Sequence, residues 1–142
     1  MSDRGHAAAE LGLAVGMLLV PVAFAVLGFG PWSERRVFAE AAAAEAARAA
    51  VIDLSTASGV VVVGDMAANH GLTDELVMLG WCGAEPTSLS GEEAACDFDR
   101  GSDVTAEVSV WVPLVATPWG DIGGLWVSAT HAEPIDLYRS LE

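Results

Sequence analysis

The longest run of residues without an ionisable side chain lies close to the N-terminus. It contains 23 residues, from Leu11 to Ser33, between Glu10 and Glu34. At about 1.5 Å of rise per residue, a helix of this length crosses a hydrocarbon layer roughly 30 Å thick. The run therefore predicts a transmembrane helix at residues 6–33, in which residues 11–33 contact the membrane.

A cleaved secretory signal is the alternative interpretation of this run. Such a signal has a basic start, an apolar stretch of about 7–15 residues and a cleavage site of small residues. Here the start is barely basic and the apolar run is longer. The residues after it, Phe29–Trp32 and then Glu34, do not form such a site, and Ala41–Ala43 lies where the sequence still reads as helix. A retained helix is favoured.

Acidic side chains dominate the rest of the chain. The 142 residues carry 20 acidic and 6 basic side chains, a net charge of −14. From Asp53 onward, 15 acids stand against Arg100 and Arg139, which gives 2 − 15 = −13. Binding to nucleic-acid phosphates needs clustered Lys or Arg, so a nucleic-acid partner is excluded. An anionic membrane surface is expected to repel this part of the chain, which should stand away from lipid.

The two cysteines, Cys82 and Cys96, lie in this acidic part. A pair in a small domain outside the cytoplasm most often forms a disulfide, and closing a loop of about 15 residues stabilises by roughly 3 kcal/mol. Two reduced, unrelated thiols are the alternative. The histidines His6, His70 and His131 are scattered and neither cysteine has a second ligand nearby, so no metal site is expected.

Two features of the sequence predict opposite orientations of the chain in the membrane. Cytoplasmic segments next to a membrane helix are usually rich in Arg and Lys. Arg4 precedes the apolar run, whereas Arg35, Arg36 and Arg48 follow it, which favours the acidic domain inside the cell. The predicted disulfide and the N-terminal motif described below require the opposite. We expect a single-pass protein of the cell membrane with an extracytoplasmic C-terminal domain.

Helix is predicted to continue beyond the apolar run. Residues 34–54 are dense in alanine, the strongest helix former. Apolar residues recur there at helical spacing: Val37, Ala41, Ala44, Ala47 (or Arg48) and Val51. Residues 60–70 are ambiguous, since four consecutive valines favour a strand while the residues up to Gly71 resemble a helix end with a glycine cap. A short second helix is favoured.

The remaining residues predict an antiparallel sheet. Residues 104–114 and 125–130 alternate apolar with polar or aromatic side chains, and Thr117–Gly120 is a turn between them. A register that pairs Trp111 with Trp126 turns the valines toward the alanine-rich helix and both tryptophans away from it. The pair is a candidate interface, unless the second helix covers both rings as core. We expect an α+β fold in which a small antiparallel sheet of the domain at residues 55–142 packs on the long helix.

No pattern in the sequence predicts an enzyme or a cofactor. Neither a Gly-x-Ser-x-Gly nor a His-Glu-x-x-His motif occurs. The spacing of Asp97, Asp99, Gly101 and Asp103 has some character of a calcium loop but lacks the closing Glu. A solvated acidic loop is the favoured interpretation.

A glycine and a carboxylate precede the apolar run. Gly5 lies five residues before Glu10, which directly precedes the apolar run of the predicted membrane helix. A Glu at that depth is costly and is rarely kept without a partner. Cleavage after Gly5 would free an amino group at His6, and Glu10 of a neighbouring subunit would neutralise that charge. The alternative is a Glu that merely ends the span at the level of the headgroups.

With these residues the chain resembles the TadE/TadG-like minor pseudopilins of tight-adherence (Flp-type) pilus systems, which are related to type IV pilins. The resemblance covers the Gly5 to Glu10 junction with its membrane helix, the alanine-rich residues 45–50 and the valine-rich hairpin near the C-terminus. It implies a pilin-like fold and a leader at residues 1–5. It also implies that a prepilin peptidase cuts between Gly5 and His6, and that Glu10 is the glutamate used in assembly.

The same resemblance implies a structural role in a pilus or secretion assembly. The implied partners are other pilins or pseudopilins, the membrane platform that assembles the pilus, and the prepilin peptidase. The alternative function is a permanently anchored extracytoplasmic module that binds a protein without entering a pilus. Retention of residues 1–5 on the mature protein would favour this alternative.

Overall fold

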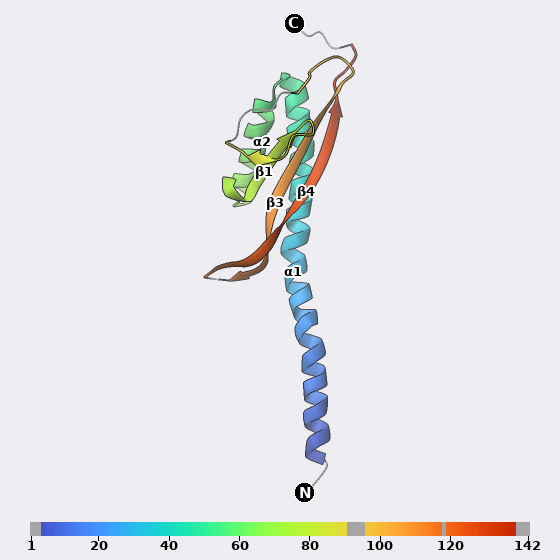
Figure 1. Ribbon diagram of the computed structural model, residues 1–142, viewed down its shortest axis with the longest axis vertical. Helices are drawn as coiled ribbons and strands as arrows, with labels where there is room; N and C mark the ends of the chain where they lie inside the picture. The colour runs from blue at the N-terminus through green and yellow to red at the C-terminus, as the bar shows by residue number, and fades with distance from the viewer. Residues whose placement is uncertain (1–3, 91–95, 118, 139–142) are drawn as a thin grey trace.

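A computed structural model of the chain describes residues 4–90, 96–117 and 119–138 and has an α+β architecture (Figure 1). One layer holds the helices α1 (Arg4–Asp53) and α2 (Thr56–Asn69). The other is a four-stranded antiparallel sheet in the order β2-β1-β3-β4. Its strands are β1 (Val77–Trp81), β2 (Thr87–Ser88), β3 (Asp103–Thr117) and β4 (Gly120–Pro134). A single turn of 3₁₀-helix, η1 (Asp74–Leu76), precedes β1. The expected α+β class, with a small antiparallel sheet packed on a long helix, is confirmed, whereas the membrane-spanning and pilin-like parts of that expectation stay predictions.

The helix α1 has two halves with different surroundings. It runs for 50 residues without a break, through both Pro21 and Pro31. Its C-terminal half packs against α2, β3 and β4, whereas most of its N-terminal half projects away from the rest of the molecule (Figure 1). We call residues 4–33 the stalk and residues 34–138 the domain.

The buried face of α1 is alanine-rich, but it differs from the predicted stripe. Val37 is 64% exposed, and Ala41 is exposed as well. The buried residues instead form adjacent pairs, namely Phe38, Ala39, Ala42, Ala43, Ala46, Ala47, Ala50 and Val51. The predicted stripe was therefore wrong at Val37 and Ala41, whereas Ala44 is half-buried and Ala47 and Val51 are buried. The reason is that both the sheet and α2 cover this helix, so a wider face is buried than a single stripe provides.

The second helix is confirmed, and the valine run belongs to it. α2 starts earlier than predicted, at Thr56, because the Ser55 hydroxyl accepts a hydrogen bond from the backbone N–H of Ala57 and caps the helix. Val63 is fully buried in the core, whereas Val61 is 63% exposed. The valines thus lie on different sides of a helix, as its period requires.

Strands β3 and β4 form a long hairpin with the predicted register. Trp111 pairs with Trp126, and the two rings meet edge to face with centroids 5.4 Å apart. On the opposite face, Val108 and Val110 are fully buried in the core that includes α1. Trp126 remains 39% exposed, so α2 does not bury the two rings as core. Of the predicted turn, Pro118 lies outside the described residues.

The predicted disulfide between Cys82 and Cys96 is present. Cys82 directly follows β1, and its N–H donates a hydrogen bond to the Thr105 carbonyl of β3 at 2.8 Å. The disulfide therefore ties the far end of the acidic loop to the C-terminal end of β1, beside the start of β3. The alternative of two unrelated reduced thiols is wrong.

Candidate functional site

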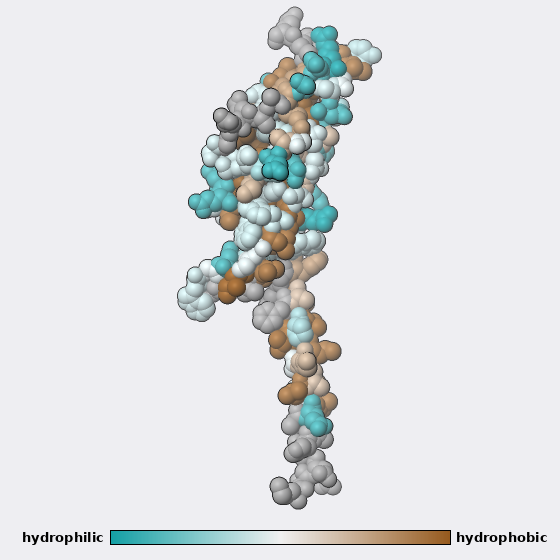
Figure 2. All heavy atoms as spheres, in the orientation of Figure 1, coloured by the Kyte–Doolittle hydropathy of each residue, from teal (hydrophilic) through white to brown (hydrophobic). Residues whose placement is uncertain are grey.

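The stalk carries large apolar side chains on all its sides. Four consecutive residues, Met17 to Val20, are each more than half exposed, with fractions of 78%, 66%, 55% and 55%. Because successive residues of a helix point about 100° apart, these four cover the whole circumference. On the face turned to the viewer, brown apolar side chains cover much of the stalk between its N-terminal end and the domain (Figure 2). Helices that are apolar all round occur inside proteins or membranes, so we expect the stalk to be covered in the functional state.

The residues of the predicted processing motif lie at the start of the stalk. The backbone of Gly5 and His6 belongs to the first turn of α1, and the side chains of residues 1–9 lie outside the described set. Glu10 is exposed, and none of the ion pairs found among the described residues includes it. The first N–H groups of a helix have no partner within it. Opening this turn for a peptidase therefore breaks few hydrogen bonds.

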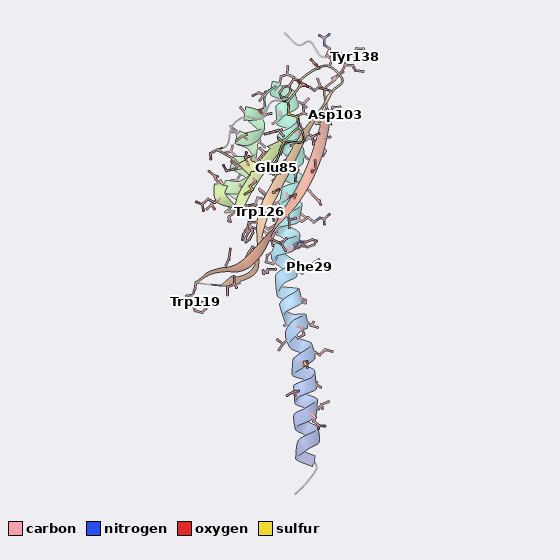
Figure 3. The ribbon with its side chains drawn as sticks, in the orientation of Figure 1. Phe29, Glu85, Asp103, Trp119, Trp126 and Tyr138 are labelled. Carbon is pink, nitrogen blue, oxygen red and sulfur yellow. A yellow bond between two sulfur atoms is a disulfide. The ribbon has the colours of Figure 1, made fainter. Side chains whose placement is uncertain are left out.

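The pair Trp111–Trp126 lies on the face of the hairpin that is turned away from α1. Figure 3 shows Trp126 on the hairpin, between the end of the hairpin at Asp103 and its tip at Trp119. The ring of Trp111 lies over Gly124, where the Cβ of any other residue would collide with it. Beside the pair, the hydroxyls of Ser109 and Ser128 share a hydrogen bond of 2.8 Å. This half-exposed aromatic pair is the candidate contact surface that the sequence predicted.

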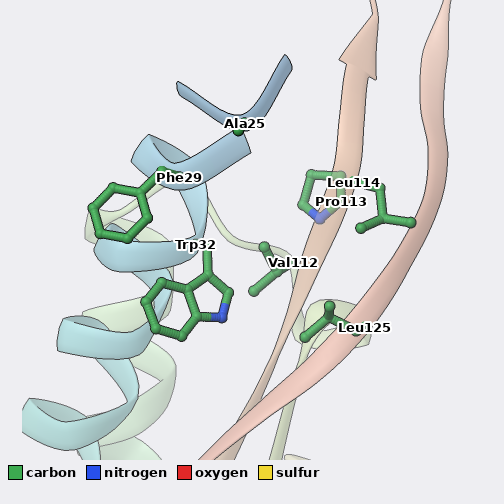
Figure 4. A pocket seen from close by; sticks show the side chains of 7 residues that line it. All are labelled: Ala25, Phe29, Trp32, Val112, Pro113, Leu114 and Leu125. Carbon is green, nitrogen blue, oxygen red and sulfur yellow. The ribbon is translucent and has the colours of Figure 1, made fainter. Parts of the chain in front are cut away.

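An apolar crevice of about 280 Å³ lies where the hairpin passes the stalk (Figure 4). Its lining consists of Ala25, Phe29 and Trp32 from α1, Val112, Pro113 and Leu114 from β3, and Leu125 from β4. The rings of Phe29 and Trp32 have centroids 5.7 Å apart, and the guanidinium of Arg36 lies 5.6 Å from the Trp32 ring centroid. These described lining residues include no carboxylate, histidine, hydroxyl or thiol. The crevice can hold an apolar group but has nothing for proton transfer or nucleophilic attack.

Sequence reasoning missed this crevice and the hairpin end that forms one wall of it. The crevice exists because one segment lies beside another that is about 85 residues away in the chain, which local periodicity does not reveal. A signal was present, however. Between Glu107 and His131 the sequence has one ionisable residue, Asp121, although the surrounding domain is strongly acidic.

Charged groups of the domain form ion pairs on its surface. Arg36 pairs with Glu40 and Arg48 with Glu45, each at 3.0 Å and with both side chains about half exposed. Exposed pairs of this kind contribute about 0–1 kcal/mol. Within the residues that the structure describes, no three His, Cys, Asp or Glu side chains are arranged to hold a metal ion. The loop of Asp97 and Asp99 instead accepts hydrogen bonds from the Ser102 hydroxyl through its carbonyl groups.

Comparison with protein-family models, with curated proteins and with solved structures gave no match. Among the helices in the described part of the chain, none was found to be long and apolar enough to cross a membrane. A function must therefore be argued from the residues and contacts described above.

Proposed function

We propose that this chain is a membrane-anchored structural subunit of a pilus or secretion assembly, similar to the minor pseudopilins of tight-adherence systems. The observation that carries the proposal is the division of α1. The helix is apolar and exposed on all sides along the stalk, and its continuation forms the core of an acidic domain. A pilin-like subunit uses one helix in this way, first as an anchor and then as the spine of its domain.

The proposed surrounding of the stalk is the hydrocarbon layer of a membrane. Burial of apolar surface is favourable by about 25 cal/mol per Å², so side chains such as Leu13 and Met17, at 73% and 78% exposed, favour an apolar surrounding. Support for a membrane around the stalk comes from the 23 residues, 11–33, that contain no ionisable group. The experiment below decides it.

The proposed orientation places the domain outside the cytoplasm. A disulfide such as Cys82–Cys96 persists in oxidising compartments and is rare in the cytoplasm. Arg35 and Arg36, directly after the apolar run, favour the opposite orientation. We give the disulfide more weight because it ties two parts of the folded domain together, whereas the arginine bias rests on few residues.

Processing and assembly complete the proposal. A prepilin peptidase removes residues 1–5, and the new amino group of His6 pairs with Glu10 of a neighbouring subunit. Two observations support this. Gly5 lies in the first turn of α1, which opens easily. Glu10 is exposed at the end of the apolar run, where a carboxylate without a partner is costly.

The test is the intact mass of the protein purified from its native membranes. The expected mass lacks residues 1–5 and two hydrogens lost on forming the disulfide. Gly5→Val should retain the full precursor, because a branched side chain hinders the peptidase. Gly12→Val is the matched control, since its surroundings are open and it lies beyond the junction. Processing of the Gly5 variant, or release of the wild type from membranes at alkaline pH, would contradict the proposal.

A permanently anchored binding module is the second candidate, and the exposed pair Trp111–Trp126 favours it. Half-exposed tryptophans on an acidic domain mark a surface that docks another protein. Replacing both by Ser should weaken partner binding under either function. The mass of the mature protein separates the two, since only the pseudopilin-like function requires loss of residues 1–5.

A further inference from the structure

The end of the β3–β4 hairpin differs in charge from the domain to which it belongs. It presents four exposed apolar side chains: Leu114 at 60%, Trp119 at 92%, Ile122 at 63% and Leu125 at 41%. From residue 108 to residue 130 the single ionisable residue is Asp121, in a part of the chain with a net charge of −13. An apolar and nearly uncharged projection on such a domain needs a partner that is itself apolar.

The hairpin end lies beside the stalk and not beside the buried part of α1. Figure 3 shows Trp119 to the side of α1 and nearer to its N-terminal end than Phe29. Phe29 belongs to the run without ionisable residues, four residues before its last member, Ser33. Four residues of helix correspond to about 6 Å. If the run lies in a bilayer, this depth matches the roughly 5–10 Å at which interfacial segments are buried.

Contacts with the stalk hold the hairpin end at this level. Val112 is 3% exposed, and with Leu114 and Leu125 it lines the crevice against Phe29 and Trp32. Beyond the crevice the hairpin bends away from α1 and extends sideways (Figure 1). Gly123, at φ +64°, has the positive φ that glycine adopts most easily, which permits such a bend. The end is thus directed across the helix axis, along the plane of a membrane that the stalk would cross.

The chemistry of the hairpin end fits the interface layer and not the hydrocarbon centre. A tryptophan ring is apolar with one polar N–H, and tryptophan is enriched at both membrane–water interfaces. The outer edge of a strand carries backbone groups that need water, which the hydrocarbon centre does not supply. Asp121, one residue after Gly120 in β4, must also reach water. Lipid headgroups without net charge meet these needs and avoid repulsion from the acidic domain.

We propose that residues 112–117 and 119–125 rest in the interface layer of the bilayer that the stalk crosses, with Trp119 as the tip of this second anchor. The proposal rests on the membrane insertion proposed above. The proposal limits the expectation that the acidic domain stands away from lipid, because contact is confined to the nearly uncharged end of the hairpin. With two attachment points, the domain would hold one tilt and one rotation relative to the membrane.

Fluorine NMR of the full chain in phosphatidylcholine vesicles tests the proposal. Incorporation of 5-fluorotryptophan gives one reporter at each of the five tryptophans, Trp32, Trp81, Trp111, Trp119 and Trp126. Single Trp→Phe variants assign the signals. A nitroxide attached to the lipid chain near its headgroup broadens signals in the interface, and a water-soluble nitroxide broadens signals in solvent. Trp81, at 4% exposed, is the control that neither probe should reach.

The expected result is that the lipid-borne nitroxide broadens Trp119 as strongly as Trp32, whereas the water-soluble probe broadens Trp126 and spares Trp119. Broadening of Trp119 by the water-soluble probe alone, with Trp32 still responding to the lipid, would overturn the second anchor and leave the stalk in the membrane. Shielding of Trp119 from both probes would mean that a second copy covers it, which also overturns the proposal. Loss of the lipid effect at Trp32 would instead overturn the membrane insertion on which the proposal rests.

Discussion

Gly59 sets how closely the two helices approach each other. It lies in α2, and a Cβ built on it would meet the Trp81 ring and lie 2.8 Å from the Ala46 carbonyl oxygen of α1. Trp81 is 4% exposed, so its ring has no free space into which it can move. The missing side chain therefore lets one large ring of the sheet fit against both helices.

Gly59→Ala should destabilise the domain by about 1–3 kcal/mol, the usual range for overpacking in a core. The gain of about 1 kcal/mol in helix propensity does not offset this, since neither the Ala46 carbonyl nor the Trp81 ring can yield easily. Gly64→Ala in the same helix has nothing within 4 Å and should stabilise by up to about 1 kcal/mol. Denaturant unfolding of both variants measures the difference. Equal effects would contradict the close packing at Gly59.

Glu10→Gln should leave membrane association intact and weaken assembly with partner subunits. It removes a charge that is costly near lipid, so insertion becomes easier. The amino group of a processed neighbour would lose its counter-charge. Glu34→Gln, at the other end of the uncharged run, is the matched control and should assemble normally. Co-purification of partner pilins measures the effect. If the Glu10 variant recovers as much partner as the wild type does, Glu10 only marks the end of the membrane helix and has no role in assembly.

The hairpin was predictable from sequence because its information is local. Alternation along residues 104–114 assigns each side chain to a face, and a two-residue turn then fixes the register that pairs Trp111 with Trp126. The disulfide was predictable for a similar reason, since two cysteines in a small acidic domain have few other roles.

The buried face of α1 and the hairpin end were less predictable. In an alanine-rich segment all faces look alike, so the choice between Val37 and Phe38 depends on what covers the helix. The structure buries Phe38 beside His70, with ring centroids 5.1 Å apart. Likewise, the crevice at Phe29 and Leu125 depends on a contact between distant parts of the chain. Periodicity identifies elements, but it does not identify their neighbours.

Loss of the Cys82–Cys96 disulfide should lower the free energy of unfolding by about 3 kcal/mol in the chain-entropy model. The double variant Cys82→Ser/Cys96→Ser tests this without adding a reductant. Denaturant unfolding of the full chain in detergent measures the change, and the reduced wild type should behave as the variant does. An unchanged midpoint would mean that the acidic loop is held by other contacts.

At the scale of the whole molecule, one helix joins the apolar stalk to the acidic domain. The 50 residues of α1 correspond to about 75 Å, of which the uncharged run supplies nearly half. The acidic residues are distributed unevenly, because only Asp3 and Glu10 precede Glu34 among the 20. The core begins only after the run, with Phe38 as its first buried residue. The domain and the stalk are thus stabilised by separate sets of contacts.

A chain that starts at Glu34 should therefore fold and remain soluble without detergent, whereas the full chain should need detergent or lipid. The truncation removes no buried core residue, and it leaves a strongly acidic surface that resists association. It does remove Phe29 and Trp32 from the crevice, so the hairpin end loses its support. Expression in an oxidising compartment, followed by size-exclusion chromatography, thermal unfolding and thiol alkylation, measures the outcome. A monomer with one cooperative transition and cysteines that react only after reduction is expected. An aggregated product would show that the stalk is part of the folding unit, and two free thiols would contradict the extracytoplasmic orientation.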